Sequence, residues 1–423
     1  TGTIAGQFKA HEYEIVPFGA AADVVVLNTC TVTEQADRKC RQAIRKALRA
    51  NEEACVIVTG CFAQLRPEQI ANIPGVDVVL GANEKFDVFR YVDAFTKKEK
   101  TQVDVSCIDD VTEFGAAFSA SERTRAFLKV QDGCDYTCSF CTIPKARGKS
   151  RSALVSDLTR QAEEIASRGY REIVLSGVNI GLFGQERGGN LLGLLQELDG
   201  VSGIDRFRIS SCEPNLLTDQ IIDFVGESRA FMPHFHLPLQ SGDDFVLGKM
   251  RRRYRTSDYL GRIERVLSVM PDAAIGVDVI VGFPAEGNAQ FEQTYSFIES
   301  LPISYLHVFT YSERPETIAV DQLELMGGSF VDKGVRSERN RRLRVVSEKK
   351  KGAFYSRFYG HHRPVLWESL ESHNKMSGFT DNHILVNAEY DEVRSGTIQT
   401  VQLGRMNSKG QVEIPEMESF PII

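Results

Sequence analysis

GCDYTCSFC, residues 133–141, is the stretch that decides the fold, because it places three of the chain's nine cysteines within eight residues. Zinc sites usually take their cysteines in two pairs, whereas the spacing here is Cys-x3-Cys-x2-Cys with no obvious fourth ligand nearby. Three thiolates on one short loop suit a [4Fe–4S] cluster, which takes one ligand per iron and would keep one iron open to an external ligand. The alternatives are a structural zinc loop and reduced cysteines in a core. The spacing favours the cluster.

The sequence around this loop predicts an α/β segment that begins at about residue 123. Helical patterns separate its β-rich runs, which are FLKVQD, REIVLSGVNIG, RFRISSCEP, FHLPLQSG, AAIGVDVIVGFP and YLHVFTYSERP. The first run leads directly into the cysteine loop. Strands at this spacing, each ending in glycine, serine, proline or polar residues, predict a full or partial (β/α) barrel with its active face at the carboxyl ends of the strands.

Upstream, residues 1–95 predict a small α/β domain with a parallel sheet. Its apolar runs are DVVVLN at 23–28, ACVIVTG at 54–60 and VDVVLG at 76–81. Two of these strands end in a cysteine, Cys30 and Cys61. Ligand sites in open α/β sheets form at the carboxyl ends of strands, so the two thiols are candidate paired ligands. Residues 96–122 are polar and predict a linker.

Downstream of about residue 330 the composition becomes basic and then β-rich. Eleven lysines and arginines lie between Lys333 and Arg363, against Glu338 and Glu348. Short alternating strands with Gly, Asn and Asp turns follow and predict a small all-β barrel-like module. A basic helix beside such a module predicts phosphate contacts with RNA, although it is also consistent with a solvated helix face. Trp367, His383 and Tyr390 are candidate base-stacking residues that could equally belong to a core.

The composition places the chain among globular proteins, with 423 residues, 42% hydrophobic and 25% charged. Its length predicts two or three domains. No apolar run is long enough to span a membrane, and the first residues lack the pattern of a signal peptide. Cysteines without a secretion signal argue against a disulfide scaffold, and we expect a cytoplasmic location. The net charge of −7 does not by itself suggest a nucleic-acid binder.

The loop resembles the signature of the radical S-adenosylmethionine (SAM) superfamily, Cys-x3-Cys-x-aromatic-Cys, which Cys134, Cys138, Phe140 and Cys141 match. The resemblance narrows to the methylthiotransferases through motifs that follow in the family's order. These are NTCTVTEQADRKCRQAIRKA, VTGC, DGCDYTCSFCTIPKARGKSRS, LSGVNIG, ISSCEP, HLPLQSGDDFVLGKMRRRY, DVIVGFP and FTYSERP. The β tail resembles the TRAM RNA-binding domain. Together the motifs cover nearly the whole chain.

The resemblance implies a radical SAM barrel at 120–347, between an N-terminal methylthiotransferase domain at 1–95 and a TRAM-like domain at 350–423. It implies two [4Fe–4S] clusters and SAM, which binds the open iron and gives a 5′-deoxyadenosyl radical on one-electron reduction. One cluster lies on Cys134, Cys138 and Cys141. Cys30 and Cys61 match the second and third ligands of the auxiliary cluster, and the first ligand would precede Thr1.

The resemblance also assigns polar groups at strand ends to the cofactor pocket. The cofactor-binding residues that we expect, besides Phe140, are Gly177, Asn179, Glu213, Gln240, Ser241 and Arg252. Each has a structural alternative, such as a salt bridge for Glu213 or a solvated helix face for the run around Arg252. The sequence departs from the usual family pattern after VGFP, where it has Ala285-Glu286-Gly287, and after SERP, where it has Glu316.

The expected function is a tRNA methylthiotransferase that adds a methylthio group to C2 of N6-threonylcarbamoyladenosine, beside the anticodon. An aromatic C–H bond has no acidic proton, which is why a radical is needed. The expected partners are the anticodon stem-loop and an electron donor such as flavodoxin or ferredoxin, with no membrane partner. Alternatives within the family modify N6-isopentenyladenosine in tRNA or an aspartate of a ribosomal protein. An alternative of another class is a non-catalytic RNA-binding protein with a structural metal.

Overall fold

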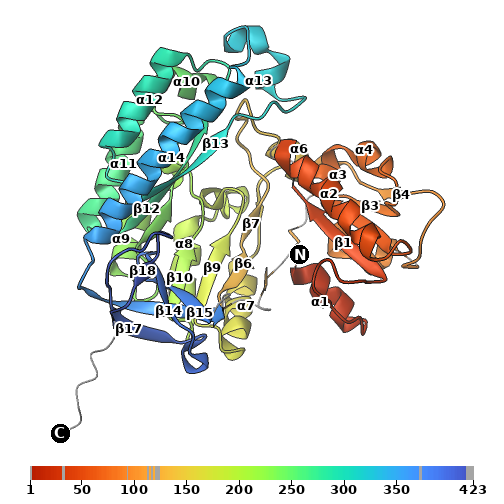
Figure 1. Cartoon of the computed structure of the whole chain (residues 1–423), viewed down its shortest axis with the longest axis horizontal. Helices are drawn as coiled ribbons and strands as arrows, with labels where there is room; N and C mark the ends of the chain where they lie inside the picture. Colours follow the sequence, from red (N-terminus) through yellow and green to blue (C-terminus); the bar gives the residue numbers. More distant parts are fainter. Residues whose placement is uncertain are drawn as a thin grey trace. The chain divides into compact units, whose positions relative to one another are not determined.

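The computed structural model describes residues 2–30, 34–92, 94–111, 114–115, 118–119, 124–370 and 374–415 (Figure 1). Residues 31–33 of the N-terminal motif and parts of the predicted linker therefore lie outside the described residues. The chain divides into two compact units. The first unit contains residues 1–119, 131–153 and 312–329, and the second unit contains residues 120–130, 154–311 and 330–423.

The first unit is built on a parallel sheet in the order β1-β2-β3-β4, which confirms the predicted N-terminal α/β fold. Its strands are β1 (Val24–Thr29), β2 (Cys55–Gly60), β3 (Val78–Leu80) and β4 (Gln102–Asp104). Its larger helices are α1 (Gly2–Ala10), α2 (Glu34–Ala50), α3 (Cys61–Leu65), α4 (Pro67–Ala71) and α5 (Val88–Tyr91). Each residue of β2 is buried, because helices cover both faces of the sheet.

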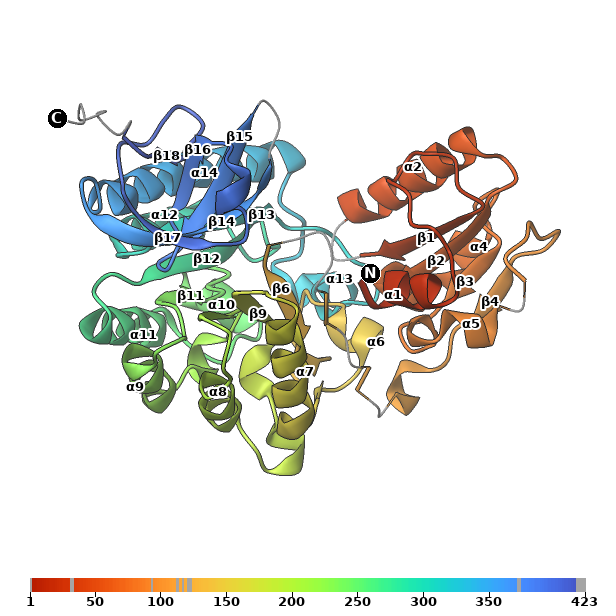
Figure 2. The same cartoon turned by 90° about the horizontal axis from the view of Figure 1, so that it is seen from below.

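Alternate residues of the sheet strands contribute to two hydrophobic cores, one on each face of the sheet. Ile44 of α2 packs with Val56 and Val58 on one face, and Phe8 of α1 packs with Ile57 and Leu80 on the other. Figure 2 shows α2 on one side of this sheet and α1 and α5 on the opposite side. This arrangement leaves the carboxyl ends of β1 and β2 at one edge of the sheet, where their terminal residues Thr29 and Gly60 are paired.

The cysteine loop also belongs to the first unit. It lies between the short antiparallel strands β7 (Gln131–Asp132) and β8 (Arg151–Ser152), and helix α6 (Ile143–Arg147) follows its last cysteine. The segment 312–329 contributes α13 (Ile318–Asp321), whose Ala319 N–H donates to the carbonyl oxygen of Ser139 at 2.8 Å. The loop is thereby held from both ends and from its middle.

The second unit contains the partial barrel that the sequence predicts. Parallel strands form two runs, β10-β9-β6 and β11-β12-β13, and isolated bridges from Phe207 to Phe231 and from Ser211 to His236 connect the runs. The strands are β6 (Ala126–Lys129), β9 (Glu172–Ser176), β10 (Arg206–Ile209), β11 (His234–His236), β12 (Ala274–Val281) and β13 (Tyr305–Thr310). The helices are α7 (Val155–Ser167), α8 (Leu191–Asp199), α9 (Asp219–Glu227), α10 (Asp244–Lys249), α11 (Thr256–Val269), α12 (Asn288–Ser300) and α14 (Lys333–Ser356). Figure 2 shows α7, α8, α9 and α11 on the outside of the strands.

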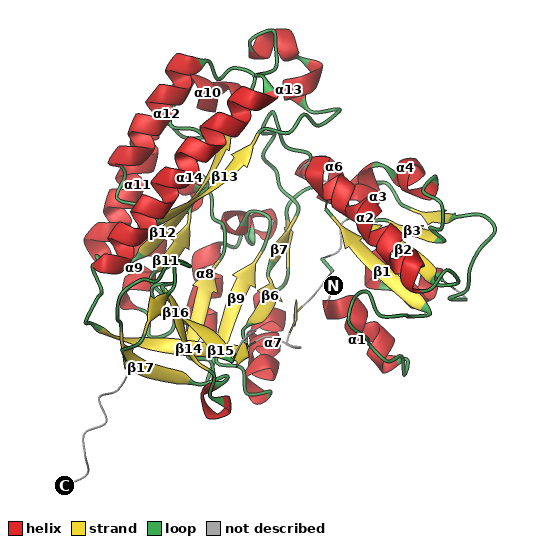
Figure 3. Ribbon diagram, in the orientation of Figure 1, coloured by secondary structure: helices red, strands yellow, loops and turns green. Residues whose placement is uncertain are grey.

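A curled sheet of order β17-β14-β15-β16-β18 completes the second unit (Figure 3). Its strands are β14 (His362–Leu370), β15 (Lys375–Thr380), β16 (Leu385–Glu389), β17 (Ile398–Gln402) and β18 (Val412–Glu413). The sheet covers the amino-terminal end of the barrel, because Arg206, the first residue of β10, donates to the carbonyl oxygens of Pro364 at 2.7 Å and Phe379 at 3.0 Å. The carboxyl ends of the barrel strands are on the opposite side.

Two of the three candidate stacking residues of this sheet pack against other side chains of the second unit. Trp367 is fully buried, and the ring of His383 stacks between His234, at 4.0 Å, and Phe379, at 4.7 Å. Burial lowers the pKa of His383 well below its ordinary value, so this imidazole is neutral near pH 7. Tyr390 is partly buried against the same core. Trp367 and His383 are therefore packing residues in this sheet.

Candidate active site

The cysteine loop has a backbone that only glycine permits at its start. Gly133 has a φ of 71°, and a Cβ there would lie 2.0 Å from the carbonyl oxygen of Lys149. The next residue, Cys134, donates its N–H to the carbonyl oxygen of Gly148 at 3.1 Å. Beneath the turn, the buried amide of Gln131 donates to the carbonyl oxygen of Gly133 at 2.8 Å. These contacts fix the direction in which the loop presents its thiols.

The three thiols are reduced and differ in exposure. Cys138 is buried, whereas Cys134 and Cys141 are half-buried. Backbone N–H groups donate to two of the sulfurs, from Tyr136 to Cys134 and from Ile143 to Cys141, each at 3.4 Å. Amide donors of this kind stabilise metal-bound thiolates and tune the potential of iron–sulfur clusters. Phe140, beside the last thiol, is half-buried.

The loop offers three thiols from one short segment of the chain. A single zinc ion needs its ligand atoms gathered around one point, whereas each cysteine of a [4Fe–4S] cluster binds its own iron. Three thiols on one loop are thus a donor set that fits an iron–sulfur cluster, and their role as its ligands stays a prediction.

Cys30 and Cys61 lie side by side at the carboxyl edge of the first unit's sheet. Cys30 directly follows β1 and is exposed, and Cys61 directly follows β2 and is buried. The backbone at Gly60 has a φ of 99°, and a Cβ there would lie 2.3 Å from the carbonyl oxygen of Thr29. Glycine thus allows the two strand ends to approach closely. The structure places the two thiols as expected, and their role as cluster ligands stays a prediction.

Arg147 connects the two cysteine groups within the first unit. Its Nε donates to the sulfur of Cys61 at 3.3 Å, and its Nη1 donates to Asp132, just before the cysteine loop, at 3.0 Å. Burial alone lowers the pKa of Arg147, but the nearby Cys61 and Asp132 outweigh that effect and raise it. Sequence reasoning did not find this residue. The available signal was a basic residue in the run CTIPKARG that directly follows the last thiol.

The cofactor residues predicted for the second unit follow the carboxyl ends of neighbouring barrel strands. Gly177 and Asn179 follow β9, Glu213 follows β10, and Gln240 and Ser241 follow β11. Arg252 comes after α10. In (β/α) barrels this is the face on which active sites are built. The structure therefore brings the predicted residues to one end of the barrel.

Contacts around these residues separate ligand-facing groups from structural ones. Glu213 and Arg252 form an ion pair with each other, and their side chains are only 14% and 3% exposed. Ser241 is a packing residue, since its Oγ lies 3.1 Å from Oγ1 of Thr294 on α12. Gln240 has a left-handed φ of 67°, and its buried Oε1 has no hydrogen-bond partner among the described residues. A strained residue with an unsatisfied polar atom at this face is suited to contact a ligand.

A cluster that sequence reasoning missed lies on the inner face of the barrel. Nε2 of His236 and Nδ1 of His307 lie 3.1 and 3.2 Å from the same oxygen of Asp278. The three residues come from β11, β12 and β13. Their signal in the sequence was weak, because each strand contributes only one residue and nothing in the sequence spacing relates the three. This cluster adds hydrogen-bonding groups to the inner face.

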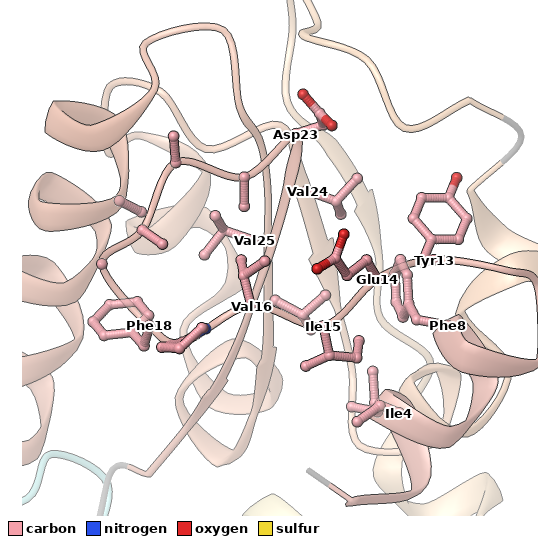
Figure 4. A pocket seen from close by; sticks show the side chains of 18 of the residues that line it. Ile4, Phe8, Tyr13, Glu14, Ile15, Val16, Phe18, Asp23, Val24 and Val25 are labelled. Carbon is pink, nitrogen blue, oxygen red and sulfur yellow. The ribbon is translucent and has the colours of Figure 1, made fainter.

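The first unit also has an apolar pocket of about 500 Å³ along the open edge of β1 (Figure 4). Side chains of α1, such as Ile4 and Phe8, and of β1, such as Val24, line it. Tyr13 and Glu14 also line it (Figure 4). The lining contains no cysteine and none of the predicted site residues. The pocket is thus separate from the predicted chemistry.

The basic helix α14 uses much of its charge inside the second unit. Arg336 and Arg339 are buried, and Arg339 donates to Glu286 at 2.7 Å. Arg342 pairs with Glu292 at 2.6 Å. Exposed cations remain on the helix at Lys333, Arg341, Arg344 and Lys349. RNA binding by this segment stays a prediction, and it rests on fewer residues than the sequence suggested. No helix in the described ranges is long and apolar enough to cross a membrane.

Comparisons with known proteins agree with this geometry. A sequence model of the Uncharacterized protein family UPF0004 matches residues 1–81, and one of the Radical SAM superfamily matches residues 128–298. The threonylcarbamoyladenosine tRNA methylthiotransferase MtaB of Bacillus subtilis is 38% identical over 94% of this chain and 88% of that protein. The protein of the same name from Aquifex aeolicus is 36% identical over 93% and 94%.

More distant relatives share the family but differ in name. The tRNA-2-methylthio-N(6)-dimethylallyladenosine synthase of Thermobifida fusca is 32% identical over 95% of this chain and 83% of that protein. Among solved structures, the radical SAM methyltransferase TsrM of Kitasatospora setae, with cobalamin and a [4Fe-4S] cluster bound, matches with a TM-score of 0.51 and 14% identity over 74% of this chain and 68% of that one. That likeness concerns the fold alone.

Proposed function

The chain belongs to the radical SAM methylthiotransferases, and from this premise we propose that its substrate is N6-threonylcarbamoyladenosine in the anticodon loop of tRNA. The observation that carries the proposal is the 38% identity to the Bacillus subtilis enzyme over nearly the whole chain. The relative named for dimethylallyladenosine is 32% identical at similar coverage. The threonylcarbamoyl substrate is therefore the first candidate, and the isopentenyl substrate is the second.

The residues of the cysteine loop fit an iron–sulfur cluster, and Cys134, Cys138 and Cys141 would hold it. When bound, the cluster with SAM supplies the electron and the carbon radical that an unactivated aromatic C–H bond requires. The loop itself presents three thiols in a fixed direction, and its N–H groups donate to the sulfurs of Cys134 and Cys141. Cys138 is buried, which protects this thiol from water and oxidants.

We propose Cys30 and Cys61 as two ligands of an auxiliary cluster, together with a cysteine expected before residue 1. Arg147 would donate a hydrogen bond near this cluster, because it already reaches the sulfur of Cys61 at 3.3 Å. The chemistry of the donor set fits, since thiolates are the usual ligands of such clusters. The cluster would carry the sulfur that is transferred.

At the barrel face, Gly177, Asn179, Gln240 and the Glu213–Arg252 pair are the groups that we propose to contact SAM. The buried oxygen of Gln240 would accept a hydrogen bond from an amino or hydroxyl group of the ligand. Arg252 would reach the cofactor carboxylate only by sharing its guanidinium with Glu213. Ser241 would not contact SAM itself, but its hydrogen bond with Thr294 would hold the turn after β11 against α12.

The remaining expectations are proposals of the same kind. The chain would have three functional domains. Residues 1–95 would hold the auxiliary cluster that carries the sulfur, residues 120–347 would form the radical, and residues 350–423, with a TRAM-like fold, would bind RNA. Exposed cations of α14 and of the curled sheet would contact phosphates of the anticodon stem-loop. An electron donor such as flavodoxin or ferredoxin would supply the reducing electron, in the cytoplasm.

The test is mass spectrometry of tRNA nucleosides from a strain that lacks the gene and from the same strain with the gene restored. The proposal predicts that 2-methylthio-N6-threonylcarbamoyladenosine disappears without the gene and returns with it, while the unmethylthiolated nucleoside accumulates. Loss of the methylthio derivative of isopentenyladenosine instead would assign the second candidate substrate.

A further inference from the structure

The inner face of the second half-barrel carries a connected set of polar side chains. Side chains of a strand alternate between its two faces, so Tyr305, His307 and Phe309 of β13 share one face. Hydrogen bonds identify this face as the inner one: His234 of β11 reaches the hydroxyl of Tyr305 at 2.9 Å, and Asp278 of β12 reaches His307 at 3.2 Å. On this face Tyr305 is half-buried, whereas His307 and Phe309 are exposed.

Hydrogen bonding fixes the proton positions in the polar cluster. Burial acts to raise the pKa of Asp278, but hydrogen bonds from His236 and His307 outweigh it and hold the pKa at about 2. The carboxylate is therefore an acceptor, and Nε2 of His236 and Nδ1 of His307 must carry protons. Nδ1 of His236 lies 2.7 Å from the hydroxyl of Ser211, which satisfies its second nitrogen. His307 remains with Nε2 as an acceptor when the ring is neutral.

The remaining nitrogen of His307 points to no protein group. The side chain of His307 is 54% exposed, and Nε2 has no hydrogen-bond partner among the described residues. Two residues further along the same face, the ring of Phe309 is 45% exposed. Phe309 therefore presents an aromatic ring, and His307 an oriented imidazole nitrogen, on the same exposed part of this face.

The position of this face relates it to the predicted cofactor residues. The carbonyl oxygen of Asp278 accepts hydrogen bonds from the N–H groups of Leu239 and Gln240, at 3.1 and 2.8 Å. Gln240 is the strained residue with the unsatisfied buried oxygen. Asp278 of β12 therefore belongs to the polar cluster through its side chain and contacts the predicted cofactor residue Gln240 through its carbonyl oxygen.

We propose that this inner face holds the substrate base, with Phe309 stacking on the adenine ring and Nε2 of His307 hydrogen-bonding to the base or its N6 substituent. Enzymes that modify a base take it out of its stack, and they hold it by aromatic stacking and by hydrogen bonds to its edges. Asp278 is a positioning residue, which orients His307 through Nδ1. The inference rests on the proposed tRNA substrate.

A divalent metal ion is the competing explanation for the polar cluster. Its three ligand atoms lie within 4.8 Å of one another, and two histidines with one carboxylate form a known metal-binding set. The distances of 3.1 and 3.2 Å are those of ordinary hydrogen bonds, and protons on both nitrogens satisfy them. The hydrogen-bonded arrangement therefore needs no ion.

The test compares variants of the reconstituted full-length enzyme with an anticodon stem-loop that carries N6-threonylcarbamoyladenosine. Phe309→Ala removes the stacking ring, and His307→Asn keeps a donor near Nδ1 for Asp278 but removes the outward nitrogen. Phe245→Ala is the matched control, since Phe245 is 56% exposed on the outer helix α10. Readouts are the dissociation constant, KM, kcat, and the ratio of 5′-deoxyadenosine to methylthiolated product.

Stacking of one base contributes about 1–3 kcal/mol, so we expect Phe309→Ala to raise the dissociation constant about 5- to 150-fold, with a smaller change in the rate of 5′-deoxyadenosine formation. His307→Asn should raise the dissociation constant several-fold. It should also increase the ratio of 5′-deoxyadenosine to methylthiolated product, because a misplaced base leaves the radical without its target. The control should bind like the wild type.

Wild-type binding and product ratios in both variants would overturn the inference. A stoichiometric divalent metal that Asp278→Asn removes would also overturn it, in favour of a metal site. Failure of the proposed function is distinguishable, because then the wild type itself would not methylthiolate this stem-loop.

Discussion

Arg208 is expected to hold the curled sheet to the barrel, and its loss should be among the most destabilising changes in the second unit. Its Nε and Nη2 donate to both oxygens of Glu172, at 2.8 and 3.3 Å, and the guanidinium also reaches the carbonyl oxygens of Thr380 at 2.7 Å and Asp381 at 2.9 Å. The side chains of Arg208 and Glu172 are 3% and 0% exposed.

Replacing Arg208 by Met would leave a buried carboxylate with only longer contacts, from Arg206 at 3.7 Å and Arg125 at 3.9 Å. It would also remove a donor from the carbonyl oxygens of Asp381 and Thr380, of which Thr380 keeps the N–H of His383 at 3.1 Å. Breaking a buried pair by removing one partner typically costs about 3–5 kcal/mol. We therefore expect Arg208→Met to lower the free energy of unfolding of the second unit by about 3–5 kcal/mol.

The assay is urea unfolding of the apoprotein, followed by circular dichroism and by limited proteolysis of the curled sheet. The double variant Arg208→Met with Glu172→Gln should recover part of the loss, because it no longer buries an uncompensated charge. Arg168→Met is the control, since Arg168 is 49% exposed and pairs with Glu164 on the surface of α7. A loss below about 1 kcal/mol for Arg208→Met, or no recovery in the double variant, would refute the reasoning.

Three further predictions follow from the site. Cys138→Ala should lower the iron content of the reconstituted protein by about four irons per chain and abolish 5′-deoxyadenosine formation, as measured by iron analysis and chromatography; an unchanged iron content would contradict the ligand assignment. Arg147→Gln should lower the stability of the apoprotein by about 1–3 kcal/mol, because Asp132 is buried and accepts a charged hydrogen bond from Arg147. Arg147→Lys keeps the charge and should lose less stability. Equal stability of the wild type and Arg147→Gln would argue against that contact. Asp278 has a pKa of about 2, below its ordinary value of 3.8, so it contributes about 2 kcal/mol to the free energy of unfolding above pH 4, and this contribution is lost as the pH falls toward 2. Over that range the Asp278→Asn apoprotein should therefore lose less stability than the wild type. Parallel acid unfolding curves would show that the hydrogen bonds do not stabilise the carboxylate.

The sequence was sufficient for the features that depend on local pattern. The apolar runs at 23–28 and 54–60 became the parallel strands β1 and β2. β2 is buried because helices cover both faces of the sheet, whereas β1, at the edge of the sheet, is half-buried. Because parallel strands end at one edge of a sheet, the strand pattern alone was enough to place Cys30 and Cys61 together. The barrel strands and the C-terminal curled sheet were predicted for the same reason, from runs of alternating or continuous apolar residues.

Contacts between distant residues were not predictable. Arg147 meets Cys61 across 86 positions, and the hydrogen-bonded cluster of His236, Asp278 and His307 draws one residue from each of three strands. Arginine in a helix usually faces water, so the burial of Arg339 against Glu286 could not be read from composition. That acid belongs to the Ala285-Glu286-Gly287 departure from the family pattern, and its carboxylate also accepts the N–H of Gly282 at 2.8 Å.

The most direct test of the account is single-turnover reaction of the anaerobically reconstituted protein with SAM, a low-potential reductant and tRNA that carries N6-threonylcarbamoyladenosine. We expect mass spectrometry to find a methylthio group at C2 of that nucleoside, together with 5′-deoxyadenosine, and to find neither with Cys134→Ala. Formation of 5′-deoxyadenosine without a methylthiolated nucleoside, or methylthiolation only of tRNA that carries isopentenyladenosine, would contradict the substrate assignment. Binding of zinc alone, with no cleavage of SAM, would contradict the account as a whole.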